Sequence, residues 1–195
     1  MKAMHNNAVK GLVLALFLTL ALNSQAFAAA VGYACYRDKD SGQAPQFNPW
    51  HAGLVSVVNG SAISKVIHHP GSGVLVEVTF ANFINGLPDR GYFFRSGVSG
   101  PMLSNINARA KELLNMGNVK YTLFSLVSIN QSATSLAWIE PKHVSFVRCD
   151  GLVEFCYEYY GIRLQGASSN WCIADPNHHG SHPWGCEPKD QAYSF

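Results

Sequence analysis

The chain has 195 residues, of which 48% are hydrophobic and 13% are charged, with 14 lysines and arginines against 12 acidic residues. Loss of the N-terminal signal described next would remove Lys2 and Lys10 and no acid, which leaves the charges balanced. This balance does not support nucleic acid or an anionic membrane as a partner, and the remaining length suits one domain with its own core.

The first predicted element is a secretory signal over residues 1–29. Lys2 and Lys10 accompany an apolar run from Gly11 to Leu22, and Ala26-Phe27-Ala28 then places small residues where a signal peptidase reads. The apolar run is shorter than the roughly 18 residues that a membrane span needs. The sequence therefore predicts a secreted or periplasmic protein without a stable membrane span.

Four strands are predicted next, after a loop-like stretch from Val31 to Pro49. They cover residues 51–58, 63–68, 74–80 and 92–95, which are rich in β-branched and aromatic side chains. Asn59-Gly60 separates the first two strands and is the strongest short signal for a tight hairpin turn. These two strands are therefore expected to pair as a hairpin.

A helix is predicted after the strands. Its apolar face has helical spacing and consists of Leu103, Ile106, Ala110, Leu113 and Leu114. Ser99 or Gly100 can cap the helix before Pro101, and Gly117 can end it. The stretch 120–139 that follows is interpreted as a loop-bearing insertion.

A second helix is expected over residues 149–160, ended by Gly161. Cys149 begins it and lies on one stripe with Leu152, Val153, Cys156 and Tyr160, so the thiol should face the interior. The order of elements predicts one α+β domain over residues 30–165. Residues 166–195 have little periodicity and are predicted to form an irregular tail.

Five cysteines, an odd number, remain after the signal. An oxidising compartment favours pairing. Cys172 and Cys186 bracket a loop rich in glycine and proline and are the first expected disulfide; Cys35 can pair with Cys156, which leaves Cys149 free. In the alternative, Cys149 is a disulfide partner and Cys156 is the spare thiol.

Cys149 is the candidate nucleophile. A helix N-terminus carries partial positive charge and can lower the pKa of a thiol placed there. Such a cysteine needs a base and a third group that orients the base. His51 opens the first strand and is the candidate base; His68 ends the neighbouring strand and is the candidate orienting residue. His69 should point to the other face and is the weaker choice.

These residues resemble a known family. Cys149-Asp150-Gly151-Leu152-Val153 is similar to the Cys-Ser-Gly-Leu-Val motif of the NlpC-type papain-like peptidases of cell walls. His51-Ala52-Gly53-Leu54-Val55 is similar to their His-Val-Gly-Ile-Tyr strand, and Val66-Ile67-His68 resembles the apolar pair before their third catalytic residue. Residues 108–114 and Tyr121 look like the helix and tyrosine before the nucleophile.

Both histidines precede the cysteine, the order of the circularly permuted branch, which includes the lecithin retinol acyltransferase-like proteins. The resemblance covers most of residues 50–161 and implies a papain-like fold, in which an antiparallel sheet packs against the helix that carries the cysteine. The chain departs from the family at Asp150, where serine is usual, at Arg148, and in a longer gap from Tyr121 to the cysteine.

By this resemblance, Cys149 attacks an amide or ester carbonyl after losing its proton to His51, and His68 holds His51 in the working tautomer. The Cys149 backbone N–H can stabilise the oxyanion. The implied enzyme is a monomeric hydrolase, a cysteine peptidase or amidase, acting on peptidoglycan stem peptides or related cell-wall peptides without a cofactor. The alternatives are a lipid-directed thiol acyltransferase or esterase and a catalytically inactive binding domain.

A second cluster of polar residues lies in the predicted tail. His178, His179, His182 and Asp175 are residue types that bind zinc, but their spacing fits no firm template, and we interpret them as a solvated loop. No metal is therefore expected. Trp50, Trp171 and Trp184 can line a groove or belong to the core.

Overall fold

The structure is a computed structural model that describes residues 28–39, 50–123, 125–130, 139–164 and 188–195. The predicted signal, apart from its last two residues, lies outside the described residues. So do the predicted Cys172–Cys186 disulfide and the histidines of the tail. Among the described residues, no helix is long and apolar enough to cross a membrane.

The larger of two sheets is five-stranded and antiparallel, with the order β4-β3-β2-β1-β5. Its strands are β1 (Ala34–Asp38), β2 (Trp50–Asn59), β3 (Ala62–His68), β4 (Val76–Thr79) and β5 (Asp89–Phe93). The predicted hairpin is confirmed as β2 and β3, with Gly60 in the turn at a positive φ of 61°.

The prediction of a loop from Val31 to Pro49 is wrong at β1. This strand lies between β2 and β5, with Cys35 opposite both Gly53 and Tyr92. The segment Ala34–Asp38 contains no β-branched residue and ends in two charged ones, so its sequence does not indicate a strand. It is the pairing on both sides, with residues distant in the chain, that makes this segment a strand.

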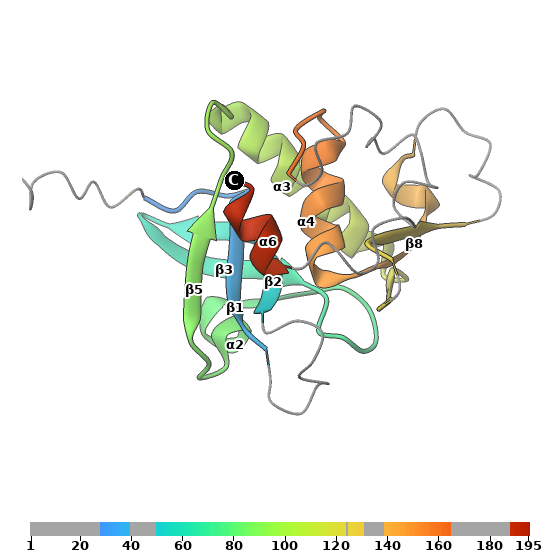
Figure 1. Ribbon diagram of the computed structural model, residues 1–195, viewed down its shortest axis with the longest axis horizontal. Helices are drawn as coiled ribbons and strands as arrows, with labels where there is room; N and C mark the ends of the chain where they lie inside the picture. The colour runs from blue at the N-terminus through green and yellow to red at the C-terminus, as the bar shows by residue number, and fades with distance from the viewer. Residues whose placement is uncertain (1–27, 40–49, 124, 131–138, 165–187) are drawn as a thin grey trace, which may run out of the picture.

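Helices cover both faces of this sheet (Figure 1). The predicted helices are confirmed as α3 (Gly100–Met116), capped by Ser99 and ended by Gly117, and α4 (Cys149–Glu158). Both contact β2. A further short helix, α2 (Phe80–Ile84), is capped by Thr79 and packs beside β3 and β4. The chain is α+β, with an antiparallel sheet packed against helices, as predicted.

Residues 120–139, predicted as a loop-bearing insertion, contribute two strands to a second sheet. Its order is β6-β8-β7, formed by β6 (Lys120–Tyr121), β7 (Val127–Ile129) and β8 (Val144–Val147), which follows the 3₁₀ turn Pro141–His143. The strand β8 leads directly into α4, and an isolated bridge joins Val74 to Lys120. The small sheet therefore fixes where α4 begins.

The predicted irregular tail ends in a helix. This helix, α6 (Pro188–Tyr193), contacts β1, β2 and α4 (Figure 1). Gln191 and Ala192 of α6 are buried, so the last residues of the chain belong to the core rather than to a loose tail.

The two faces of the sheet can be distinguished by alternation along β1 and β2. Tyr36 lies on the α4 side, because its hydroxyl donates to Gln191 of α6, which in turn donates to Glu154 of α4. Side chains one residue away point to the opposite face, where Phe83 of α2 is fully buried. Figure 1 shows α4 beside the large sheet, with β8 beyond it.

Gly151 is a close-packing point in the first turn of α4. A Cβ at this position would lie 1.8 Å from the carbonyl oxygen of Leu126, which is backbone and cannot move aside. Gly151→Ala is therefore expected to lower the free energy of unfolding by about 3 kcal/mol, the upper range for overpacking a core. Urea denaturation monitored by circular dichroism measures this loss.

The matched control is Gly100→Ala at the start of α3, where a Cβ would meet nothing within 4 Å. This variant should be neutral or more stable by up to about 1 kcal/mol, because alanine favours helices and restricts the unfolded chain. Equal stabilities of the two variants would contradict the close contact at Gly151.

Candidate active site

Cys149 occupies the first position of α4, directly after the N-cap residue Arg148. Its side chain is 4% exposed, so the thiol faces the interior as predicted. The whole of α4 is buried rather than one stripe, and Tyr160, the last residue of the predicted stripe, lies beyond the helix and is half-buried. The thiol is thus placed where the backbone N–H groups of a helix end are not used within the helix.

The helix that begins at Cys149 packs on β2 of the large sheet. Burial raises the pKa of the Cys149 thiol, and the backbone N–H of Ala52, the residue after His51, partly opposes this effect. This N–H is available for a geometric reason. Val55 donates to Tyr33 on the β1 side, so the N–H of Ala52 points to the β3 side. The β2–β3 ladder begins only at Leu54, and Cys149 lies where the two strands have separated.

His51 and His68 form a pair at this same end of the sheet. His51 Nε2 lies 2.9 Å from His68 Nδ1, and the rings meet edge to face with centroids 5.1 Å apart. Both side chains are buried. No hydrogen-bond partner contacts His51 Nδ1 within the described part of the chain. The structure thus brings together the two histidines that the sequence singled out. By strand alternation, however, His51 shares the face of Arg37 and Phe83, opposite to the face of Tyr36 and α4, so the pair is not brought to Cys149.

The surroundings of the pair keep both rings neutral. Burial, followed by the charges of His68 and Arg37, lowers the pKa of His51 well below its ordinary value. Burial and Arg37 lower the pKa of His68 to about 4. Phe83 packs against both rings, at centroid distances of 5.7 Å from His51 and 5.3 Å from His68. The Phe83 ring and the buried guanidinium of Arg37 therefore take the place of solvent around the two histidines.

Sequence reasoning missed Arg37 and Phe83. Arg37 stands opposite His51 in the register of β1 and β2, and its guanidinium lies 5.6 Å from the centre of the Phe83 ring. Both residues belong to elements that were not predicted, β1 and α2. The only local signal was Thr79, whose side chain accepts from the N–H of Asn82 and caps α2.

His69, the weaker candidate for the third residue, lies elsewhere. Its ring is 5.0 Å from that of Tyr121, and its Nδ1 accepts from the Gly71 N–H at 3.3 Å. Within the described residues, no hydrogen bond joins His69 to His51. The geometry therefore favours His68 over His69 as the partner of the candidate base.

Asp150, the residue that departs from the family motif, is fully buried and paired with Arg148. Arg148 Nε lies 2.6 Å from Oδ1 and Nη2 lies 2.7 Å from Oδ2, a bidentate arrangement that balances the acidic charge. The Gly151 N–H also donates to Oδ1 at 3.1 Å. The carboxylate is thus held by the start of the helix and by the neighbouring guanidinium.

The Cys149 thiol is nevertheless a weak acid in this structure. Burial and, second, the charge of Asp150 raise its pKa to about 11, against the opposing effects of the Ala52 N–H and Arg148. Across the described residues, no hydrogen bond joins the thiol to His51. Cys149 and His51 therefore both rest in their neutral forms, and the reaction would need a proton transfer from one to the other.

This resting state predicts the pH dependence of alkylation. The thiolate is the form that reacts with iodoacetamide, so with a pKa of about 11 the rate at Cys149 should rise about tenfold per pH unit between roughly pH 7 and pH 10. Mass spectrometry of the Cys149 peptide measures the rate, and Cys149→Ala gives the background from other thiols. A rate that levels off near about pH 8.5, as for an ordinary thiol, would contradict the raised pKa.

Gln191 of α6 connects the nucleophile helix to the sheet, and sequence reasoning missed it as well. Its amide nitrogen donates to the Asp150 carbonyl at 3.0 Å and to Glu154 Oε2 at 2.8 Å, and its oxygen accepts from the Tyr36 hydroxyl at 3.0 Å. A single buried glutamine in a short helix leaves no periodic signal in the sequence. Its contacts hold the first turn of α4 against β1.

The expected pairing of Cys35 with Cys156 is wrong. Cys35, Cys149 and Cys156 are all free and buried. Cys35 is next to Tyr36 on β1 and therefore faces away from α4 by strand alternation. Cys156 lies near Arg109 of α3, whose charge lowers its pKa against the larger effect of burial. The sheet separates the two thiols.

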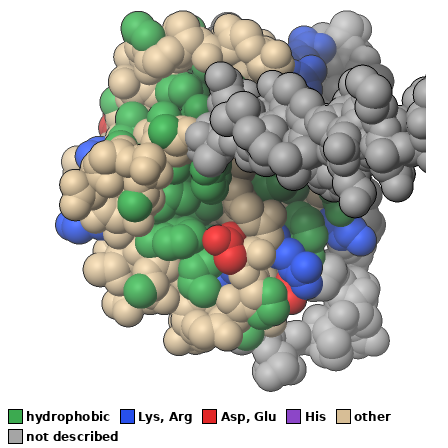
Figure 2. Space-filling model, turned by 90° about the vertical axis from the view of Figure 1, so that its left-hand side faces the viewer, with side chains coloured by type: hydrophobic (Ala, Val, Ile, Leu, Met, Phe, Trp, Pro, Cys, Tyr) green, Lys and Arg blue, Asp and Glu red, His purple; other side chains and the backbone are tan. Residues whose placement is uncertain are grey.

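No group of residues in the described ranges could hold a metal ion. The face of the molecule in Figure 2 presents hydrophobic side chains with a few charged groups, and no histidine is visible on it. Comparison with family models, curated proteins and solved structures found no match for the chain. The chemistry of the site is therefore argued from its own geometry.

Proposed function

We propose that this protein is a secreted or periplasmic cysteine hydrolase of the permuted NlpC-type, papain-like kind, which cleaves an amide bond in peptidoglycan stem peptides or related cell-wall peptides. The observation that carries the proposal is the position of Cys149. It begins α4, which packs on β2, the strand that carries His51 of the buried His51–His68 pair. The choice of cell-wall peptides rests on the sequence resemblance and the predicted secretory signal.

In the first half of the proposed reaction, the proton of the Cys149 thiol passes to Nδ1 of His51. This is the ring nitrogen that His68 does not engage. The sulfur forms a bond to the carbonyl carbon, and the carbonyl electrons move to its oxygen, which accepts from the Cys149 backbone N–H. The carbon–nitrogen bond then breaks as His51 returns its proton to the leaving amine, which gives a thioester on Cys149.

In the second half, water replaces the amine. His51 takes a proton from a water molecule as its oxygen attacks the thioester carbonyl. The carbon–sulfur bond breaks, the carboxylic acid leaves, and the proton on His51 restores the Cys149 thiol. His68 accepts the hydrogen bond of His51 Nε2 throughout, which keeps the proton off Nδ1 at the start of each cycle.

The neutral resting pair is compatible with this scheme on one condition. By strand alternation the His51 ring lies with Arg37 and Phe83 on the face of the sheet away from α4, so the start of β2 must move, as well as the thiol, before Cys149 and His51 can meet. Catalytic hydrogen bonds are often long in free enzymes and shorten in the substrate complex. We propose that substrate binding selects an arrangement of the start of β2 in which the thiol and the His51 ring meet.

Digestion of purified peptidoglycan tests this function. The full chain and its Cys149→Ala variant are incubated with the same material, and the soluble fragments are analysed by mass spectrometry. The proposal expects fragments with new amine and carboxyl ends only with Cys149 present. Identical fragments from both proteins, or none from either, would rule out the proposed hydrolase.

A catalytically inactive binding domain is the second candidate, favoured by one observation: burial raises the Cys149 pKa to about 11 while His51 stays neutral. The two candidates differ in covalent chemistry. A hydrolase should give an acyl adduct on Cys149 when an activated thioester or ester is supplied and the intact mass is measured at short times. A binding domain should give no such adduct.

His68 supplies an acceptor to His51, which predicts different effects for two substitutions. The side-chain oxygen of His68→Asn can occupy the place of Nδ1, 2.9 Å from His51, whereas His68→Leu offers no acceptor. We expect kcat for amide hydrolysis to fall at least about 10²-fold in His68→Leu and less than about tenfold in His68→Asn. Comparable losses in both variants would contradict the orienting role, and His69→Asn serves as the matched control.

A further inference from the structure

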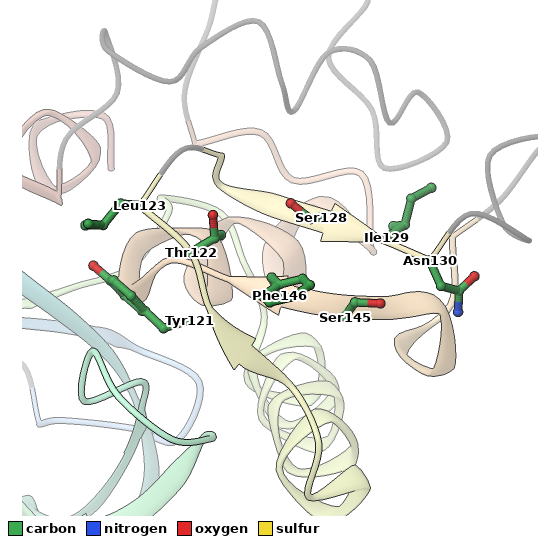
Figure 3. A pocket seen from close by; sticks show the side chains of 8 residues that line it. All are labelled: Tyr121, Thr122, Leu123, Ser128, Ile129, Asn130, Ser145 and Phe146. Carbon is green, nitrogen blue, oxygen red and sulfur yellow. The ribbon is translucent and has the colours of Figure 1, made fainter.

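The small sheet carries an open trough on the face shown in Figure 3. Its volume is about 640 Å³, within the range of pockets that hold small ligands. Residues of all three strands and their ends line it: Tyr121, Thr122, Leu123, Ser128, Ile129, Asn130, Ser145 and Phe146. The two edge strands form its sides, and β8 runs between them.

One end of the trough lies toward the start of α4, although Cys149 is not among the residues that line it. Tyr121, at that end, pairs with Val147, two residues before Cys149. Burial raises the pKa of Tyr121, and the charges of Cys149 and Asp150 raise it further. A molecule that lies along the trough can therefore present a bond to Cys149 at the Tyr121 end.

No charged side chain lines the trough. None of its eight residues is Lys, Arg, His, Asp or Glu. Leu123 is 59% exposed and Phe146 is 38% exposed, so apolar surface is open to a ligand. A charged ligand side chain would lose water here without gaining a counter-ion, which is unfavourable.

Neutral polar groups lie between these apolar side chains. Ser145 offers a hydroxyl, the Ser128 hydroxyl pairs with that of Ser125 at 2.5 Å, and Asn130 carries an amide; each of these groups can make more than one hydrogen bond. A hydrocarbon chain would remove water from these groups without replacing its hydrogen bonds. A peptide backbone supplies a donor and an acceptor at every residue, and small side chains fill the apolar parts.

We propose that this trough binds an extended peptide segment with small, uncharged side chains, which continues from the scissile amide at Cys149. The proposal rests on the proposed amide hydrolysis and specifies the substrate on one side of the bond that is cleaved. The proposal predicts that the trough binds a neutral peptide more tightly than a charged peptide or an acyl chain.

Binding can be measured without catalysis. The full chain carrying Cys149→Ala is labelled with ¹⁵N and titrated with acetyl-tetraalanine amide, with the same peptide carrying a central lysine, and with decanoate. The neutral peptide is expected to shift the amide resonances of Ser128, Ile129 and Ser145, with weaker shifts from the lysine peptide and none from decanoate. Absence of these shifts, or larger ones from decanoate or the lysine peptide, would overturn the proposal.

A matched pair of substitutions tests whether the peptide binds in the trough. Ser145→Asp adds a charge within it, whereas Ser104→Asp adds the same charge on the exposed surface of α3. We expect Ser145→Asp to weaken binding of the neutral peptide about tenfold relative to Ser104→Asp. Equal affinities for the two variants would count against the trough.

These experiments test the peptide-binding trough and the proposed hydrolysis independently. Peptide binding in a variant that lacks the thiol reports on the trough alone, whereas product release from peptidoglycan reports on the chemistry. Binding without hydrolysis would leave the trough as the site of a peptide-binding domain, and hydrolysis without binding at Ser128 and Ser145 would place the substrate elsewhere.

Discussion

Cys149→Ala is expected to lower kcat for amide hydrolysis by about 10⁶-fold, the loss that follows removal of the nucleophile from a catalytic triad. The sulfur is the only atom that bonds to the substrate in the proposed reaction, and alanine has no group that replaces it. The side chain is small and 4% exposed, so the fold should survive the change. Rates of product release by chromatography, with the thermal midpoint by circular dichroism, measure both quantities.

Cys156→Ala is the matched control. It makes the same substitution in the same helix, at a fully buried thiol that lies near Arg109 and away from the histidine pair. We expect activity near that of the unsubstituted chain. Loss of activity in both variants would show that the effect at Cys149 arises from damage to α4 rather than from loss of the nucleophile.

Asp150→Ala is expected to lower the free energy of unfolding by about 3–5 kcal/mol, the cost of removing one partner of a buried ion pair. The side chain of Arg148 is 11% exposed and that of Asp150 is fully buried. The substitution leaves a buried positive charge without the carboxylate that balances it. It also removes the acceptor of the Gly151 N–H in the first turn of α4. Urea denaturation measures the loss.

Two comparisons separate the ion pair from a general effect of substitution. Asp190→Ala changes the same residue type at an exposed position of α6 and should change stability by less than about 0.5 kcal/mol. The double variant Arg148→Met, Asp150→Leu removes both charges and should recover much of the stability that Asp150→Ala loses. A double variant as unstable as the single one would contradict this account.

The hairpin of β2 and β3 and the helices α3 and α4 could be predicted because their signals are local. Asn59-Gly60 specifies the turn, and Ser99 and Gly117 mark the ends of α3. The hairpin also places His51 and His68 side by side, because both lie at the open ends of paired strands. The pairing of these two imidazoles could therefore be predicted from the sequence.

The rest of the site depends on contacts between distant parts of the chain. β1 is a strand because β2 and β5 pair with it, and this pairing is what brings Arg37 beside His51. The short strands β6 and β7 form only by pairing with β8. Gln191 reaches Asp150 from 41 residues further along the chain. Such contacts have no periodic signature, so neither the charge around the histidines nor the trough could be predicted.

Thiol mapping of the native full chain tests the central claim most directly. The protein is alkylated without reductant, digested and analysed by mass spectrometry for the state of each cysteine. The account predicts a free thiol at Cys149 that reacts faster than Cys35 and Cys156, because the side chains of those two residues are fully buried whereas Cys149 is 4% exposed at a helix end. A Cys149 recovered in a disulfide, or one that stays unmodified while Cys35 or Cys156 reacts, would contradict the claim that Cys149 is the nucleophile.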